Sequence, residues 1–161
     1  MSEREYRLEV STSTKIVTAV ALTILAAFGV YCLESGVRET LLFSFLALAV
    51  FLLFLMMPTS IAVDGCTLTV KRVVGRTRID VSGIERIEVI EELGRGLLLG
   101  SAGLFGWYGV FVVRGETALV YSRKERDLVL VRVRGRNYVF GTGTSIISQL
   151  KRCMQSEGSR T

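Results

Sequence analysis

Histidine is absent from this chain of 161 residues. The sequence therefore lacks the side chain that most often acts as a general base near neutral pH and that most often ligates transition metals. Carboxylates do not compensate, because they are scattered; the closest group is Glu88, Glu91 and Glu92 on a predicted strand. No serine lies in a nucleophile-elbow context, and no G-x-x-x-x-G-K-[ST] motif occurs. We therefore predict a protein that is not an enzyme and that holds neither a metal ion nor a cofactor.

Cysteine is also scarce. The three cysteines, Cys32, Cys66 and Cys153, cannot all pair within one chain, and none stands in C-x-x-C spacing. We therefore expect neither a disulfide framework nor a zinc site. The simplest interpretation is that each cysteine is a small buried hydrophobic side chain, which is compatible with a reducing compartment.

Charged residues are missing from two apolar runs near the N-terminus, residues 16–33 and 41–57. A helix needs about 20 mostly apolar residues to cross the hydrocarbon core of a bilayer. A buried helix of a soluble domain would carry a polar face, and neither run has one. A cleaved signal peptide is the alternative for the first run. Its flank SEREYRLEV mixes acids with bases, however, and no clear A-x-A cleavage site follows. The two runs predict a transmembrane helical hairpin over residues 16–57.

The flanks of this hairpin differ in Lys and Arg content, which sets the orientation of membrane helices. The predicted turn carries Arg38 alone. The opposite side carries five bases, namely Arg4, Arg7, Lys15, Lys71 and Arg72. We therefore expect a multi-pass protein of the cell membrane with residues 1–15 and everything after Pro58 in the cytoplasm.

The part of the chain after the hairpin has an almost entirely β pattern. Asp64-Gly65 is a strong hairpin-turn signal, and short apolar stretches alternate with polar breaks. The predicted strands are residues 60–63, 66–73, 76–80, 84–92, 108–113, 117–122, 128–133 and 138–140. From Ser145 the period changes, with Ile146, Leu150 and Cys153 on one helical face. The pattern predicts a small β-barrel or sandwich over residues 58–156, closed by one C-terminal helix, and a short tail at 157–161.

Two stretches of the predicted β domain are distinctive, TSIAVDGCTLTVKRVVGRTRIDVSGIERIEVI and GRGLLLGSAGLFGWYGVFVVRGETALVYSRKERDLVLVRVRGRNYVFGT. Together with the order of about seven strands and one closing helix, which is the layout of a pleckstrin-homology (PH) domain, they make residues 60–155 resemble the bacterial and archaeal PH-like family. The most specific residues of this resemblance are Gly94, Gly96, Gly100, Gly103, Gly106, Gly109, Phe105, Trp107 and Tyr108. The resemblance implies a PH-like barrel in a membrane-associated setting, and it implies no reaction.

Two features of this domain are candidate contact sites. The glycine-rich stretch is not a nucleotide fingerprint, because it lacks G-x-G-x-x-G spacing and a following helix. Its glycines permit tight turns and close backbone approach, or the stretch is a loop that contacts the membrane, the hairpin or a partner. The apolar residues concerned are Leu97, Leu98, Leu99, Leu104, Phe105 and Trp107.

The second feature is a pair of basic clusters beside predicted turns. They comprise Lys71, Arg72, Arg76 and Arg78, and Arg123, Lys124 and Arg126. The two interpretations are a solvated basic surface and a site for anionic lipid headgroups. Nucleic acid is not an expected partner, because the aromatic residues do not alternate with the bases.

Two functions remain open on the sequence alone. In the first, the chain is a membrane-anchored PH-like module that binds or scaffolds a protein, or anionic lipid headgroups, at the cytoplasmic face. In the alternative, it is a small accessory subunit that packs its hairpin into a larger membrane complex. The expected partners are membrane lipids and either another membrane protein or a second copy of the chain.

Overall fold

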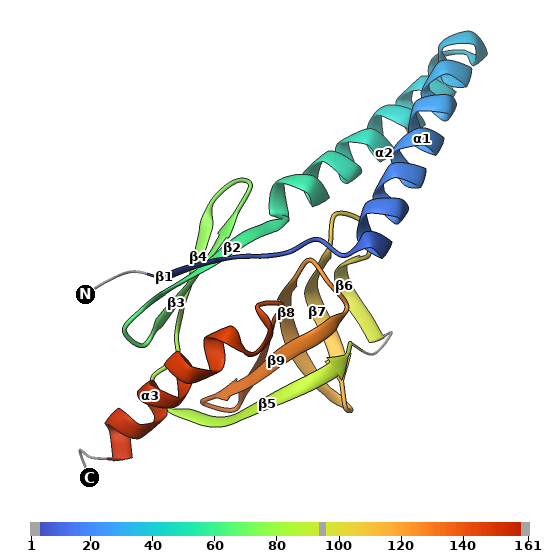
Figure 1. The fold of residues 1–161 in the computed structure, drawn as a ribbon. Helices are drawn as coiled ribbons and strands as arrows, with labels where there is room; N and C mark the ends of the chain where they lie inside the picture. The colour runs from blue at the N-terminus through green and yellow to red at the C-terminus, as the bar shows by residue number, and fades with distance from the viewer. Residues whose placement is uncertain (1–3, 94–95, 159–161) are drawn as a thin grey trace.

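The computed structural model describes residues 4–93 and 96–158, in which a pair of helices projects from a β-sheet domain (Figure 1). Helix α1 (Thr12–Ser35) and helix α2 (Val37–Met56) lie side by side. Gly36 alone separates them, and its φ of 125° is a conformation that favours glycine. The two predicted apolar helices are confirmed, although the turn between them is much shorter than expected.

Small residues let the two helices approach each other. A Cβ atom on Gly29 would lie 2.8 Å from Cζ of Phe43, so only glycine fits there without a shift of the ring. At the same end, the Thr40 hydroxyl donates to the carbonyl of Cys32 over 3.2 Å. Outward-facing side chains are exposed, and no described residue of α2 is buried.

Ten strands in the described part of the chain form two sheets. The four-stranded antiparallel sheet has the order β1 (Arg4–Arg7), β2 (Pro58–Asp64), β3 (Thr67–Arg72) and β4 (Arg76–Asp80). The six-stranded sheet has the order β5 (Ile84–Glu92), β9 (Arg126–Val133), β10 (Arg136–Phe140), β8 (Glu116–Ser122), β7 (Trp107–Val113) and β6 (Gly96–Ala102).

The predicted barrel of about seven strands is wrong in its closure, because the described strands form two separate sheets. Two strands were not expected: β1, which precedes the helices and pairs with β2, and β6, which is the glycine-rich stretch itself. The chain also leaves the first sheet after Asp80, and the bend at Gly83 starts β5 in the second sheet. A single ladder therefore does not continue around the domain.

The core explains why β9 reads as a continuous apolar run. Its side chains alternate between two buried layers, because successive residues of a strand point to opposite faces. Val129 and Val131 pack toward the four-stranded sheet with Ile61, whereas Leu128 packs in a second layer with Phe111.

The predicted C-terminal helix is present as a 3-10 turn (Gly143–Ile146) followed by α3 (Ile147–Gly158). Ile146, Leu150 and Cys153 are buried in the first layer, so the helix covers its core with the apolar face that the sequence pattern indicated.

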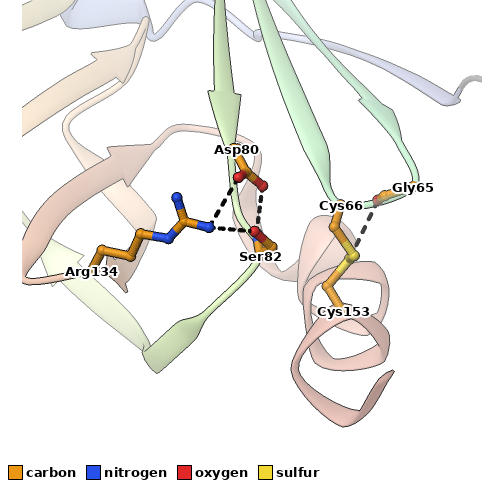
Figure 2. The surroundings of a disulfide bond; sticks show 6 residues. All are labelled: Gly65, Cys66, Asp80, Ser82, Arg134 and Cys153. Atoms are coloured by element: carbon orange, nitrogen blue, oxygen red, sulfur yellow. Dashed lines mark hydrogen bonds and ion pairs between the residues drawn. A yellow bond between two sulfur atoms is a disulfide. The ribbon is translucent and has the colours of Figure 1, made fainter. Parts of the chain in front are cut away.

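A disulfide bond joins Cys66, in the turn between β2 and β3, to Cys153 of α3 (Figure 2). The expectation that all three cysteines are unpaired is therefore wrong for these two, whereas Cys32 is a free, buried cysteine. The pair lies 87 residues apart in sequence and meets because α3 packs over the β2–β3 turn, with 5.5 Å between the two Cα atoms. Spacing along the chain gives no sign of such a contact.

Candidate functional site

At the base of the helical hairpin, hydrogen bonds join the ends of both helices to the two predicted basic turns. The N-terminus of α1 is held by the turn between β8 and β9. The Arg123 carbonyl accepts from the Ser11 backbone N–H and from the Thr14 hydroxyl, both over 3.2 Å. Ser11 is also the N-cap of α1, since its hydroxyl accepts from the Thr14 N–H over 3.1 Å.

The C-terminus of α2 is held by the turn between β3 and β4. The N–H groups of Val73 and Val74 donate to the carbonyls of Met57 and Leu55, each over 3.1 Å. The last carbonyls of a helix lack partners within the helix, and this turn supplies two. Val74 is 62% exposed at the tip of the turn, beside the helix end.

These contacts bring parts of the two predicted basic clusters to the same end of the β domain. Lys71, Arg72 and Arg76 flank the β3–β4 turn, and Arg123 and Lys124 lie in the β8–β9 turn. Arg78 lies further along β4, in register with Thr69, and Arg126 is the first residue of β9, in register with Glu92. The structure gathers the two turns, and their role as binding sites stays a prediction.

The cations at this end differ in their partners. Lys71 forms an ion pair with Glu5 over 3.0 Å, and the pKa of Glu5 is lowered by its hydrogen bond from the Ser60 hydroxyl and then by Lys71. The Arg72 guanidinium lies over the Tyr121 ring, 5.8 Å from its centroid. Burial lowers the pKa of Arg123, whose Nε is buried without a hydrogen-bond partner. Neither Arg72 nor Arg123 forms an ion pair with a carboxylate in residues 4–93 and 96–158.

Two cations at the opposite end of the six-stranded sheet, Arg132 and Arg134, are paired with acids. Arg132 lies 3.3 Å from carboxylate oxygens of both Glu85 and Glu116. Arg134 lies 3.2 Å from Asp80, whose pKa is lowered chiefly by the backbone N–H of Ser82 (Figure 2). Arg132 and Arg134 thus face carboxylates in the described part of the chain, whereas Arg72 and Arg123 do not.

The glycine-rich stretch is a β-hairpin of β6 and β7 and not a loop. Gly100 and Gly109 face each other in register, with φ values of 130° and 120°. A Cβ atom on either residue would overlap the backbone of the partner strand. Close backbone approach thus accounts for these two glycines, in agreement with the first of the two interpretations. Gly94 lies outside the described residues.

The six apolar residues of this hairpin lie in four different environments. Phe105 contacts the helices, because its N–H donates to the Thr18 hydroxyl over 3.0 Å and its ring lies 5.4 Å from that of Phe54. Trp107 packs toward Phe111 within the domain. Leu104 is half-buried at the tip of the hairpin. Leu97, Leu98 and Leu99 on the edge strand β6 are 38%, 60% and 73% exposed. Contact of these residues with a membrane or a partner stays a prediction.

Tyr108 is a residue of this region that the sequence did not identify as a site residue. Its hydroxyl donates to the Leu53 carbonyl of α2 over 2.5 Å, and burial raises its pKa to about 12. It therefore stays protonated and keeps β7 attached to the end of α2. No local pattern relates a tyrosine on a strand to a helix carbonyl 55 positions earlier. In the described part of the chain, no group of three or more His, Cys, Asp or Glu side chains forms a metal site.

The fold and the site together define a class of protein: two sheets closed by a C-terminal helix, carried on a pair of long apolar helices. The family model described as "Bacterial PH domain" matches residues 59–143, which is more than half of the chain. The chain belongs to the bacterial PH domain family, as the sequence resemblance indicated. Such domains are typically non-enzymatic. No curated protein and no solved structure gives a significant match to this chain.

Proposed function

We propose that this chain is a membrane-anchored bacterial PH module that binds anionic lipid headgroups at the cytoplasmic face. The anchor is the helical hairpin. Thr12–Cys32 and Val37–Met56 are long and apolar enough to cross a bilayer, and 6% and 0% of their most apolar windows are buried within the molecule. Exposed apolar surface of this extent is consistent with a lipid environment.

The cytoplasmic placement rests on the flanking bases. Five Lys and Arg residues near the domain side of the hairpin stand against one at the turn, and this bias favours retention of the basic side in the cytoplasm. Since β1 and β2 pair with each other, the chain before and after the hairpin lies on the same side of any membrane that both helices cross.

Headgroup binding is supported above all by the attachment of both basic turns to the base of the hairpin. The hydrogen bonds at Val73, Val74 and Arg123 place these turns beside the helix ends, where an inserted hairpin meets the phosphate layer. Each Lys or Arg near an anionic leaflet contributes about 1 kcal/mol of attraction, which decreases over a Debye length.

The test compares phosphatidylglycerol with phosphatidylcholine on the full-length protein, purified in mild detergent and observed by native mass spectrometry. We expect phosphatidylglycerol to be retained preferentially and the preference to decrease as ionic strength rises. The double variant Arg76→Gln/Lys124→Gln should lower the preference about tenfold to thirtyfold, since two bases at about 1 kcal/mol each are lost.

The matched control is Lys151→Gln/Arg152→Gln, which removes the same charge from exposed positions of α3. This control should retain the preference for phosphatidylglycerol. Equal binding of the two lipids, or an equal loss in both double variants, would contradict the proposal.

The exposed edge of the six-stranded sheet favours a second function, that of an accessory or scaffold subunit. Strand β6 is an edge strand with three exposed leucines, and unpaired apolar edges are sites of strand or partner docking. Under this proposal a stoichiometric membrane protein accompanies the chain in mild detergent, and Leu97→Ser/Leu98→Ser releases it without changing the lipid preference.

A further inference from the structure

An apolar groove lies where α2 ends against the six-stranded sheet. Its volume is about 390 Å³, within the range of small-molecule sites. Leu53 and Met56 of α2 form one wall, and Leu99, Val110 and Leu119 of strands β6, β7 and β8 form the other. Gly100 and Gly109, whose backbones lie against each other between β6 and β7, also line it.

The position of the groove distinguishes it from an ordinary surface hollow. Leu53 and Met56 belong to the last turn of the apolar helix α2, and Met56 is 52% exposed. This inference rests on the proposed insertion of the hairpin in a membrane. In that arrangement the groove opens at the boundary between the hydrocarbon core and the headgroups. An acyl chain can then enter from the bilayer without crossing water.

The groove carries one unneutralised cation. Arg72 lines it together with Tyr121, and the Arg72 guanidinium lies over that ring without an ion pair to a described carboxylate. The neighbouring Lys71 forms an ion pair with Glu5. Of the two adjacent cations, Arg72 is therefore the one without a described carboxylate partner. Of the two tyrosines that line the groove, Tyr108 donates its hydroxyl to the Leu53 carbonyl and Tyr121 lies beneath Arg72.

We propose that this groove binds one anionic phospholipid, with an acyl chain against Val110 and Leu119 and the phosphate on Arg72. The charge complementarity selects the headgroup, because an apolar site with a single unpaired guanidinium matches an amphipathic anion. The bidentate geometry of arginine is suited to phosphate oxygens. The proposal thus adds one defined lipid site to the diffuse attraction of the basic turns.

The test uses the full-length protein in phosphatidylcholine nanodiscs that contain phosphatidylglycerol with a diazirine near the end of one acyl chain. After illumination and trypsin digestion, we expect the label on the peptide of residues 115–123, which contains Leu119 and Tyr121. Val110→Trp fills the groove and leaves every cation in place, so it should reduce this label at least tenfold. Arg72→Gln should reduce it to a similar extent, and Arg152→Gln should not change it.

Folding is checked by thermal unfolding of each variant, and Leu119→Phe serves as a second filling variant if Val110→Trp is unstable. Unchanged labelling in the folded filling variants would overturn the proposal. Equal labelling by the matching phosphatidylcholine probe would overturn its anionic selectivity. Neither result would abolish the salt-dependent headgroup preference of the basic turns, so failure of this site is distinguishable from failure of the proposed function.

Discussion

At the scale of single residues, the contact between Gly100 and Gly109 shows how the β6–β7 hairpin obtains its shape. Both residues adopt positive φ, and each lies against the backbone of the other strand. Two requirements therefore coincide at one position: a conformation that side chains rarely adopt, and space that only a hydrogen atom can occupy. Gly115, in the next turn, meets the first requirement alone, because nothing lies within 4 Å of a Cβ atom added there.

This pair of glycines gives a prediction with an internal control. Gly109→Ala should lower the free energy of unfolding by more than Gly115→Ala does. Both variants force a non-glycine residue into a backbone conformation that costs about 1 to 3 kcal/mol. Only in Gly109→Ala does the new Cβ atom also overlap the backbone of Leu99. Thermal or denaturant unfolding of the purified protein measures the difference. Equal destabilisation by the two substitutions would contradict this prediction, because it would mean that β6 and β7 move apart to accept the Cβ atom at no cost in stability.

At the scale of elements, α3 is attached to the domain in two ways. Ile146 and Leu150 are buried in the core, and Cys153 is covalently joined to the β2–β3 turn. The sulfur of Cys153 also lies 3.3 Å from the Gly65 carbonyl oxygen. The helix therefore contacts two successive residues of this turn, Gly65 and Cys66 (Figure 2).

Removal of the disulfide should destabilise the protein without changing the fold. A native disulfide contributes about 2 to 4 kcal/mol, and more for long loops, and this one closes a separation of 87 residues. We expect Cys153→Ser, or treatment with reductant, to lower the denaturant midpoint to a similar extent. The control is Cys32→Ala, which should keep its sensitivity to reductant; insensitivity of the wild type to reductant would contradict the expectation.

The elements also show which parts of the fold a sequence pattern can predict. The long apolar runs and the short apolar stretches at residues 117–122 and 128–133, bounded by polar turns, are local signals, and they predicted the helices and most strands. The sequence did not predict strand β1, because REYR is polar. It did not predict β6 either, because GLLLGSA has neither alternation nor β-branched residues. The disulfide and the proximity of Arg72 to Tyr121 depend on tertiary packing, so no local signal could indicate them.

At the scale of the whole molecule, the orientation of the proposed membrane hairpin is the property with most consequences. The flanking bases favour a cytoplasmic domain, whereas stable disulfides are typical of oxidising compartments. The two observations are compatible if Cys66 and Cys153 are thiols in the cell and close on oxidation, since their backbone positions already permit the bond.

We therefore expect green fluorescent protein fused at the C-terminus to be fluorescent and alkaline phosphatase fused there to be inactive. Lysis of cells directly into an alkylating reagent should modify both Cys66 and Cys153. Phosphatase activity with unmodified cysteines would place the domain on the opposite side of the membrane.

The absence of a linker has a consequence for the range of action of this protein. Met57 alone stands between α2 and β2, and β1 returns the other end of the hairpin to the same sheet. An inserted hairpin therefore fixes the height and tilt of the PH domain above the bilayer, and the domain cannot extend toward distant targets as a tethered domain would. In that proposed arrangement the domain would search for a ligand by lateral diffusion alone, and only a ligand presented at that one height would be within reach.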